Sequence, residues 1–126
     1  MKDTNVMDSS GTLGSALDRA VLESLFAMGD ESLRRALGAQ LREDFLRLRG
    51  ALASDIAHEI GRAAHELKGL AATVGAGRLA QMARSVDDVA QGMAAPALAV
   101  IVVPLRAEVD AVIACLDDAI ADTSRR

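Results

Sequence analysis

The sequence has almost no aromatic residues, few prolines and a single cysteine. Its 126 residues include two Phe, no Trp or Tyr, two Pro and only Cys115 as cysteine. One cysteine excludes an internal disulfide and any metal site built from several cysteines. Because Cys115 stands among apolar residues, we expect it to be a small core residue. The core must therefore be built mainly from Leu, Ala, Val, Ile and Met. Hydrophobic residues make up 51% of the sequence, which is enough to form such a core.

Long hydrophobic runs and an excess of basic residues are also missing. The longest apolar run, 94–103, contains Pro96 and is too short to span a bilayer. Residues 1–14 are polar and lack the apolar run of a signal peptide. The formal net charge of −4 argues against nucleic acid as a partner, since nucleic-acid binding needs a basic surface. We therefore expect a soluble, cytoplasmic protein that binds neither nucleic acid nor membranes.

The residues that are present predict an all-α fold. Ala and Leu are abundant and turn residues are few, a composition that favours helices. Apolar residues recur every three or four positions in five successive stretches, which is the pattern of a helix with one buried face. The apolar positions, stretch by stretch, are Leu17, Val21, Leu22, Leu25 and Phe26; Leu33, Leu37, Leu41, Phe45, Leu48 and Leu52; Ile56, Ile60, Ala63, Leu67, Leu70 and Val74; Leu79, Met82, Ala83, Val86, Val89 and Met93; and Leu98, Val102, Leu105, Val109, Val112, Leu116 and Ile120.

Capping and turn residues separate these stretches. Gly29 is expected to end the first helix, and Asp30 is a good N-cap for the second. Ser54 or Asp55 is expected to cap the third helix. The Gly-Ala-Gly sequence at 75–77 predicts a tight break, and so short a link implies that the fourth helix runs antiparallel to the third.

Pro104 interrupts the last apolar stretch. A proline inside a helix removes a hydrogen bond, so we expect either a bent helix over about 97–121 or a helix that starts at Pro104. Together the stretches predict an antiparallel four-helix bundle with a short additional N-terminal helix, over 15–122. A flexible N-terminal tail is expected at 1–14 and a C-terminal tail at 123–126.

The most informative stretch is 64–76, with the sequence Ala-His-Glu-Leu-Lys-Gly-Leu-Ala-Ala-Thr-Val-Gly-Ala. On a helical wheel of 56–74, the apolar residues occupy an arc of about 100° directly opposite His65. His65 is therefore expected at the middle of the solvent face. The residues beside it are small or cationic: Gly61, Gly69, Ala72, Arg62 and Lys68. Such surroundings suit the approach of an anion carried by another molecule.

His65 and Lys68 are the candidate reactive pair. Three residues apart on a helix, their side chains are neighbours. Imidazole suits the role of a nucleophile near neutral pH, because a reference pKa of about 6.5 leaves much of it uncharged. A phosphoryl group on the ring would carry close to two negative charges, and Lys68 could contact it. Gly69, one turn beyond His65, leaves space for the backbone of another protein.

Metal and nucleotide sites are not predicted. Two His-Glu pairs, at 58–59 and 65–66, begin like the zinc-protease motif, but the fourth residue after each histidine is not a second histidine. His58 and His65 are two helical turns apart, about 10 Å along the axis, which is too far for one metal ion. The sequence also lacks a glycine-rich loop of phosphate-binding spacing and a nucleophile–base–acid set.

The stretch around His65 resembles the signature of histidine-containing phosphotransfer (HPt) domains of multistep phosphorelays. The matching pattern is Ala64-His65-x-Leu67-Lys68-Gly69-x-Ala71-x-x-Val74-Gly75-Ala76. The resemblance extends over about 17–122 and includes Leu17-Asp18-x-x-Val21-Leu22 and Gly29-Asp30. Two positions depart from the family pattern: a small polar residue is usual in place of Leu70, and Asn is frequent in place of Thr73. Since the helical wheel points Leu70 to the core, we expect the difference at this position to affect packing and not activity.

This resemblance implies a phosphorelay intermediate. By it, Nε2 of His65 attacks the phospho-aspartate of a receiver domain, including that of a hybrid histidine kinase, and later passes the group to another receiver. Lys68 stabilises the phosphoryl group, and the docking face contains Gly61, Arg62, Gly69 and Ala72. No cofactor is expected on this chain, because Mg²⁺ would be bound by the receiver. We expect a monomer without kinase activity of its own.

Other interpretations of the same residues remain open. A non-catalytic helical adaptor would dock a receiver or a kinase without accepting phosphate. A helical oligomerisation module would use the His65 face as an interface between copies. His58 lies on the same face but has no lysine three residues later, so it is a weaker alternative site of phosphorylation.

Overall fold

Five α-helices make up most of the computed structural model, which describes residues 16–125 and the side chains of 16–122. They are α1 (Arg19–Phe26), α2 (Glu31–Ala51), α3 (Ala57–Thr73), α4 (Gly77–Ala90) and α5 (Ala95–Arg125). Over this range there is no strand, so the all-α prediction is confirmed. The tail predicted at 1–14 lies outside the described residues.

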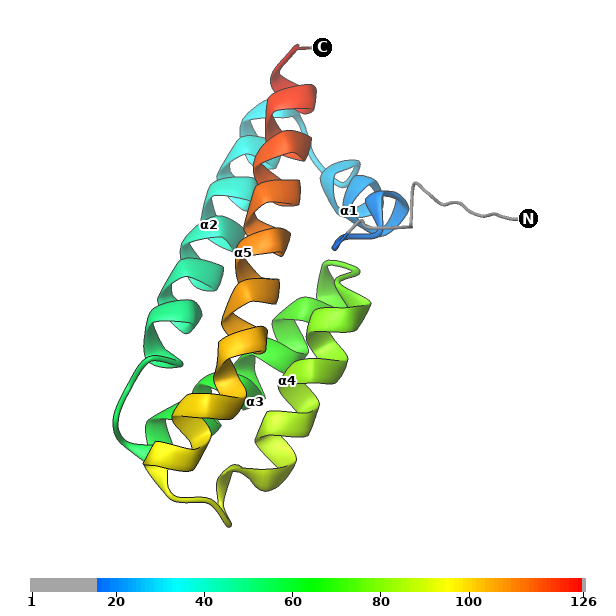
Figure 1. Ribbon diagram of the computed structural model, residues 1–126. Helices are drawn as coiled ribbons and strands as arrows, with labels where there is room; N and C mark the ends of the chain where they lie inside the picture. Colours follow the sequence, from blue (N-terminus) through cyan, green and yellow to red (C-terminus); the bar gives the residue numbers. More distant parts are fainter. Residues whose placement is uncertain (1–15, 126) are drawn as a thin grey trace, which may run out of the picture.

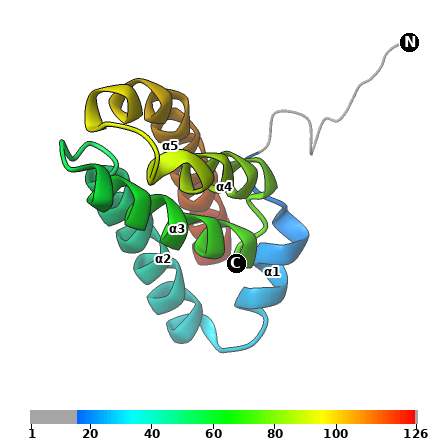
Figure 2. The ribbon, with the colours of Figure 1, turned by 90° about the horizontal axis from the view of Figure 1, so that it is seen from below.

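The helices α2 to α5 form an antiparallel bundle in which each packs mainly against two of the others. α2 contacts α3 and α5, and α4 also contacts α3 and α5. Figure 1 shows α2 and α5 side by side along much of their length, with α3 and α4 as a shorter hairpin. Seen from below in Figure 2, α1 lies outside the four-helix arrangement. The predicted bundle with a short N-terminal helix is therefore confirmed.

A side-chain cap explains where α2 begins, whereas α3 begins without one. Asp30 has extended backbone angles and its Oδ1 accepts a hydrogen bond from Leu33 N at 2.8 Å, so the predicted N-cap of α2 is confirmed. The cap predicted for α3 is wrong. Ile56 is still extended and holds the N-cap position, while Ser54 Oγ accepts a hydrogen bond from Ile56 N at 3.0 Å.

The late start of α3 moves Ile56 out of the buried stripe. Its side chain is 51% exposed, because a helical wheel places a residue only where the chain is helical. Leu33, in the first turn of α2, and Val89, in the last turn of α4, are also exposed. At helix ends, fewer neighbouring residues are available to cover an apolar side chain. Periodicity therefore overestimated burial at these three positions.

The link between α3 and α4 requires a glycine. Gly75 has φ +81°, a left-handed conformation that side chains with Cβ rarely adopt, and its carbonyl accepts a hydrogen bond from Asp18 N at 2.9 Å. A Cβ on Gly75 would lie 2.8 Å from Val21 Cβ. The tight turn between α3 and α4 thus also holds the start of α1 in place through this hydrogen bond.

Replacing Gly75 by Ala should lower the free energy of unfolding by at least about 2 kcal/mol, because left-handed strain and the overlap with Val21 act together. Gly77 is the matched control, since a Cβ there meets nothing within 4 Å and φ is not left-handed. Gly77→Ala should be neutral or stabilising by up to about 1 kcal/mol. Urea denaturation followed by circular dichroism measures both; equal effects would contradict the role given to Gly75.

The last helix continues through Pro104. α5 begins at Ala95, so the alternative of a helix starting at Pro104 is wrong. Pro104 and Val100, one turn before it, both face solvent, where water can satisfy the carbonyl that lacks a proline N–H partner. α5 reaches Arg125, so the helix extends into the segment predicted as a C-terminal tail.

The core is apolar throughout the described part of the chain. No polar or charged side chain is buried among residues 16–122. The large side chains that are almost fully buried are Phe45, Leu22, Leu48, Leu52, Ile60, Leu67, Leu79, Leu98, Leu105, Leu116, Val74 and Val102. Cys115 is half-buried and packs against this core, in line with the prediction. Within 16–125, no helix combines the length and the apolar character needed to cross a membrane.

Candidate functional site

His65 lies near the middle of α3 with its side chain in solvent. The imidazole side chain is 70% exposed, whereas Leu67 and Ala71 on the same helix are fully buried. The sequence predicted this orientation from the apolar arc opposite the ring. Exposure makes the ring accessible to a second protein.

One carboxylate on α4 joins the two residues of the candidate pair. Oδ2 of Asp87 lies 3.0 Å from Nδ1 of His65 and accepts a hydrogen bond from Nζ of Lys68 at 3.2 Å. The Asp87 side chain is 23% exposed and that of Lys68 is 36% exposed, so both are better covered than the ring. His65, Lys68 and Asp87 therefore form one hydrogen-bonded cluster across α3 and α4.

The cluster keeps Asp87 charged. The hydrogen bond with His65 is the largest cause that lowers the pKa of the Asp87 carboxyl; partial burial opposes it, and the hydrogen bond from Lys68 lowers the pKa further. The ordinary pKa of an aspartate is already far below neutrality. Asp87 is therefore a carboxylate at neutral pH and can only accept hydrogen bonds.

Glu66, the residue after His65, is held away from the cluster. Its Oε2 accepts a hydrogen bond from Nη2 of Arg47 on α2. This contact is the largest cause that lowers the pKa of Glu66, and it also raises that of Arg47. The arginine and the glutamate neutralise each other at the α2 side of the exposed ring.

A groove of about 760 Å³ opens beside His65, between α3 and α4. Its lining residues are Ala57, His58, Gly61, Arg62, His65, Glu66, Asp87, Ala90, Gln91 and Met93. On α3 these residues extend from the ring toward the N-terminal end of the helix. The groove therefore includes Gly61 and Arg62 of the predicted docking residues, whereas Lys68, Gly69 and Ala72 lie outside it, on the C-terminal side of the ring.

The glycines of α3 differ in their surroundings. A Cβ on Gly61 would lie 3.1 Å from the Cβ of Ala90, so Gly61 allows α3 and α4 to pack closely. Among the residues that the structure describes, a Cβ on Gly69 would meet nothing within 4 Å apart from the backbone of its own helix. Packing among the described residues therefore gives a reason for the glycine at position 61 but none for the glycine at position 69. Ala72 and Arg62 are both exposed.

His58 lines the same groove without comparable partners. It is exposed, and within residues 16–122 its side chain makes no hydrogen bond or ion pair. The carboxylate and the lysine that surround His65 have no counterpart at His58. The structure thus favours His65 over His58 as the reactive histidine more clearly than the sequence does.

Sequence reasoning missed Asp87, although a signal was present. His65 and Asp87 are equally far along the chain from Ala76, the middle residue of the predicted link. In an antiparallel hairpin, positions equally far from the turn face each other. Counting outward from the link would have placed an acidic residue opposite His65.

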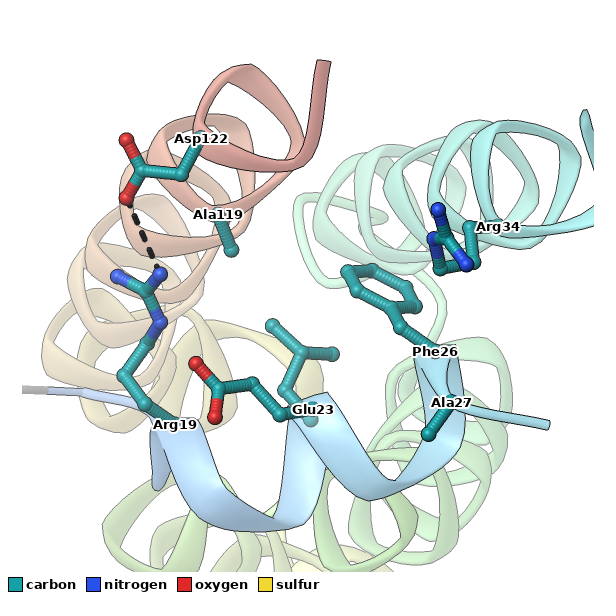
Figure 3. A pocket seen from close by; sticks show the side chains of 8 residues that line it. Arg19, Glu23, Phe26, Ala27, Arg34, Ala119 and Asp122 are labelled. Atoms are coloured by element: carbon teal, nitrogen blue, oxygen red, sulfur yellow. Dashed lines mark hydrogen bonds and ion pairs between the residues drawn. The ribbon is translucent and has the colours of Figure 1, made fainter. Parts of the chain in front are cut away.

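A second hollow, of about 300 Å³, lies between α1, α2 and α5. Figure 3 shows its lining, with Arg19 of α1 paired with Asp122 of α5 at 3.2 Å. The full set is Arg19, Leu22, Glu23, Phe26, Ala27, Arg34, Ala119 and Asp122, which contains neither histidine nor cysteine and shares no residue with the groove beside His65. Among the described residues, no group of three or more His, Cys, Asp or Glu is placed to hold a metal ion.

Comparison with known protein families gives a match to this chain. The family model described as Hpt domain matches residues 32–119, from the start of α2 to near the end of α5. The match leaves α1 outside and includes His65, Lys68 and Asp87. Comparisons with curated proteins and with solved structures found no match.

Proposed function

The chain belongs to the Hpt domain family, and on this premise we propose that His65 accepts a phosphoryl group from a receiver-domain phospho-aspartate and passes it to another receiver. Domains of this family carry out histidine phosphotransfer in two-component phosphorelays and interact with receiver domains. The observation that carries the proposal is the 70% exposed imidazole, whose Nδ1 contacts Asp87 while Nε2 is left to react.

The protein contributes a positioned nucleophile rather than a complete active site. Phosphoryl transfer depends mainly on positioning and on charge stabilisation of the transferred group. We propose that the receiver supplies Mg²⁺ and most of this charge stabilisation. Lys68 adds one cation beside the ring; a charge-assisted contact with the phosphoryl oxygens is on the order of 1–3 kcal/mol, reduced by exposure to solvent.

The docking surface that we propose has two parts. The groove beside His65 contributes Gly61 and Arg62, and the open surface beyond Lys68 contributes Gly69 and Ala72. A receiver seated over both parts would enclose the ring and exclude water from the transfer. The absence of any packing reason for Gly69 supports its place in this surface.

Mapping the modified residue tests the proposal directly. The protein is incubated with a phosphorylated receiver and Mg²⁺, and the phosphopeptide is located by mass spectrometry at alkaline pH, where phosphohistidine survives. We expect a single acid-labile phosphate on His65. Receiver binding without any such phosphate would contradict the proposal and favour the non-catalytic adaptor.

Substitutions at Gly69 should separate stability from function. Gly69→Ala should stabilise the fold by about 0.5–1 kcal/mol, because glycine is unfavourable inside a helix and the added Cβ meets no obstacle. Gly69→Leu should slow phosphotransfer by about tenfold or more, since small displacements of reacting groups have large effects on rate. The matched control is Gly50→Leu on α2, another exposed helical glycine with open space around it and outside the groove. Equal transfer rates for the Gly69→Leu and Gly50→Leu variants would remove Gly69 from the docking surface.

A further inference from the structure

The side of α5 that points away from the bundle is apolar over most of its length. Val100 and Val103 on this side are 70% and 58% exposed, and no charged residue occurs in the sequence between Asp88 and Arg106. A helix face turned to solvent ordinarily carries polar residues. We call the outward positions, all of them exposed, the outer stripe: Pro96, Val100, Val103, Ala107, Ala111, Ala114 and Asp118.

Most charged side chains of α5 lie on its flanks and pair with the neighbouring helices. On the α2 side, Asp110 accepts a hydrogen bond from Arg49 at 3.1 Å, and Asp117 accepts one from Arg42 at 2.8 Å. On the α4 side, Glu108 forms an ion pair with an arginine of α4 at 3.7 Å. These charges therefore serve contacts within the chain and leave the outer stripe without polar cover.

The outer stripe is symmetric about Ala107. Its other members lie 4, 7 and 11 residues from Ala107 in both directions along the chain. The residues before the centre are larger than those after it. If two copies of α5 pair antiparallel across a two-fold axis at Ala107, Val103 meets Ala111 of the other copy and Val100 meets Ala114. Each valine then packs against a small residue, which allows close contact between the helices.

The charges at the ends and edges of the outer stripe also favour the antiparallel arrangement. A parallel pair would place Asp118 against Asp118 of the other copy, and like charges repel, whereas the antiparallel pair places it against Pro96. On the α2 edge, the antiparallel pair brings Arg106 of one copy beside Asp110 of the other. Among the described residues, Arg106 has no hydrogen-bond or ion-pair partner, and its Nε is buried. The second copy thus offers a carboxylate to this guanidinium.

We propose that the outer stripe of α5 is the contact between two copies of this chain, paired antiparallel about Ala107. The inference does not depend on the proposed phosphotransfer. In the bundle, α2 and α4 separate α3 from α5, so contact through α5 leaves His65 exposed in both copies. The dimer would therefore present two accessible imidazoles, one on each bundle.

The size of the contact predicts a weak dimer. The outer stripe is about 33 Å long. One pair of helices of this length buries less than the roughly 800 Å² per partner of a standard stable interface. We expect a dissociation constant on the order of 10–100 μM. The monomer expected from the sequence is then the state at low concentration.

A membrane surface fits the outer stripe less well than a second copy does. Helices that lie on membranes carry Lys and Arg beside their apolar face, which attract anionic lipids. The polar residues of α5 within 95–122 are mainly acidic: Glu108, Asp110, Asp117, Asp118 and Asp122, against Arg106. Anionic lipids would repel these carboxylates, whereas the contact between two copies is apolar along its centre.

Sedimentation velocity of the full chain, from about 5 μM to about 1 mM, tests the proposal over the range of a weak dimer. The variants are Val103→Glu, Ala111→Lys and an equimolar mixture of the two. The matched control is Met28→Glu, which adds the same charge at another exposed apolar residue, 79% exposed and outside α5. Circular dichroism checks that each variant is folded.

We expect the wild type and Met28→Glu to form dimers with the same dissociation constant. Val103→Glu and Ala111→Lys should each weaken the dimer by at least about tenfold, because each places an unpaired charge in the apolar contact. The mixture should dimerise nearly as well as the wild type. In the antiparallel register, the glutamate introduced at position 103 faces the lysine introduced at position 111 of the other copy, and the second such layer keeps its native valine and alanine.

A wild type that stays monomeric at about 1 mM would overturn the inference. A dimer that Val103→Glu and Ala111→Lys leave as tight as Met28→Glu does would also overturn it, because the contact would then lie on another face. A mixture no tighter than its two components would overturn the antiparallel register about Ala107. None of these results bears on whether His65 accepts phosphate, so this proposal and the proposed function fail separately.

Discussion

Replacing His65 by Gln should abolish receiver-dependent phosphorylation, a loss of at least about 10³-fold, which is the scale expected when a nucleophile is removed. Gln keeps a polar side chain of similar length but has no nitrogen lone pair that can take a phosphoryl group. The fold should be unchanged, because the His65 side chain is 70% exposed and its hydrogen bonding to the described part of the chain is limited to the contact with Asp87. Transfer of ³²P from a labelled receiver measures the effect.

His58→Gln is the control for this experiment. His58 shares the groove with His65 but lacks the carboxylate and lysine partners, so the variant should keep most of the transfer rate. Labelling that persists in His65→Gln and disappears in His58→Gln would reverse the assignment of the phosphorylated residue. Labelling that persists in the double variant would exclude both histidines.

Replacing Leu67 by Ala should lower the free energy of unfolding by about 2–5 kcal/mol, the range measured for buried leucines in other proteins. Leu67 is fully buried on the face of α3 that points away from His65. Truncating it leaves a cavity under the helix that carries the reactive ring. Single domains are stable by only about 5–15 kcal/mol, so the loss is large enough to be seen in urea denaturation at 25 °C.

Ile56→Ala is the informative comparison for Leu67→Ala. The apolar periodicity places both residues in one stripe, yet Ile56 is 51% exposed and precedes the first turn of α3. Its truncation should therefore change stability by less than about 1 kcal/mol. Similar losses for the two variants would show that Ile56 is buried in solution and that α3 begins earlier.

The features that the sequence predicted correctly depend on local rules. Asp30 caps α2 because its side chain reaches the backbone N–H of Leu33, three residues away. The break at 75–77 follows from two glycines, and Gly75 does adopt a left-handed conformation. The exposure of His65 follows from an apolar stripe on the opposite side of one helix. Each needs information from only a few neighbouring residues.

The incorrect predictions concern places where the local rule depends on surroundings. Of the two alternatives at Pro104, only the helix that starts there was wrong: a proline favours the end of a helix, but α5 continues through Pro104 on a side that faces solvent, where water can satisfy the unpaired carbonyl. The apolar periodicity predicts that Ile56 is buried, but Ile56 precedes the first helical residue of α3, so the helical wheel does not apply to it. In both cases the intrinsic preference of the residue is as expected, and the outcome depends on where the folded chain places it.

The sequence by itself determined that this chain forms helices and that a tight link at 75–77 makes the fourth helix run antiparallel to the third. It also determined that His65 faces solvent beside Lys68 and Gly69. Only the tertiary structure decided that Asp87 joins His65 to Lys68, that Gly61 serves the packing of α3 on α4, and that the space around Gly69 is open. The physical reason is that helical periodicity fixes the direction of a side chain about its own axis, whereas contacts between helices depend on their axial offset and distance. Those two quantities are set by the packing of the whole core.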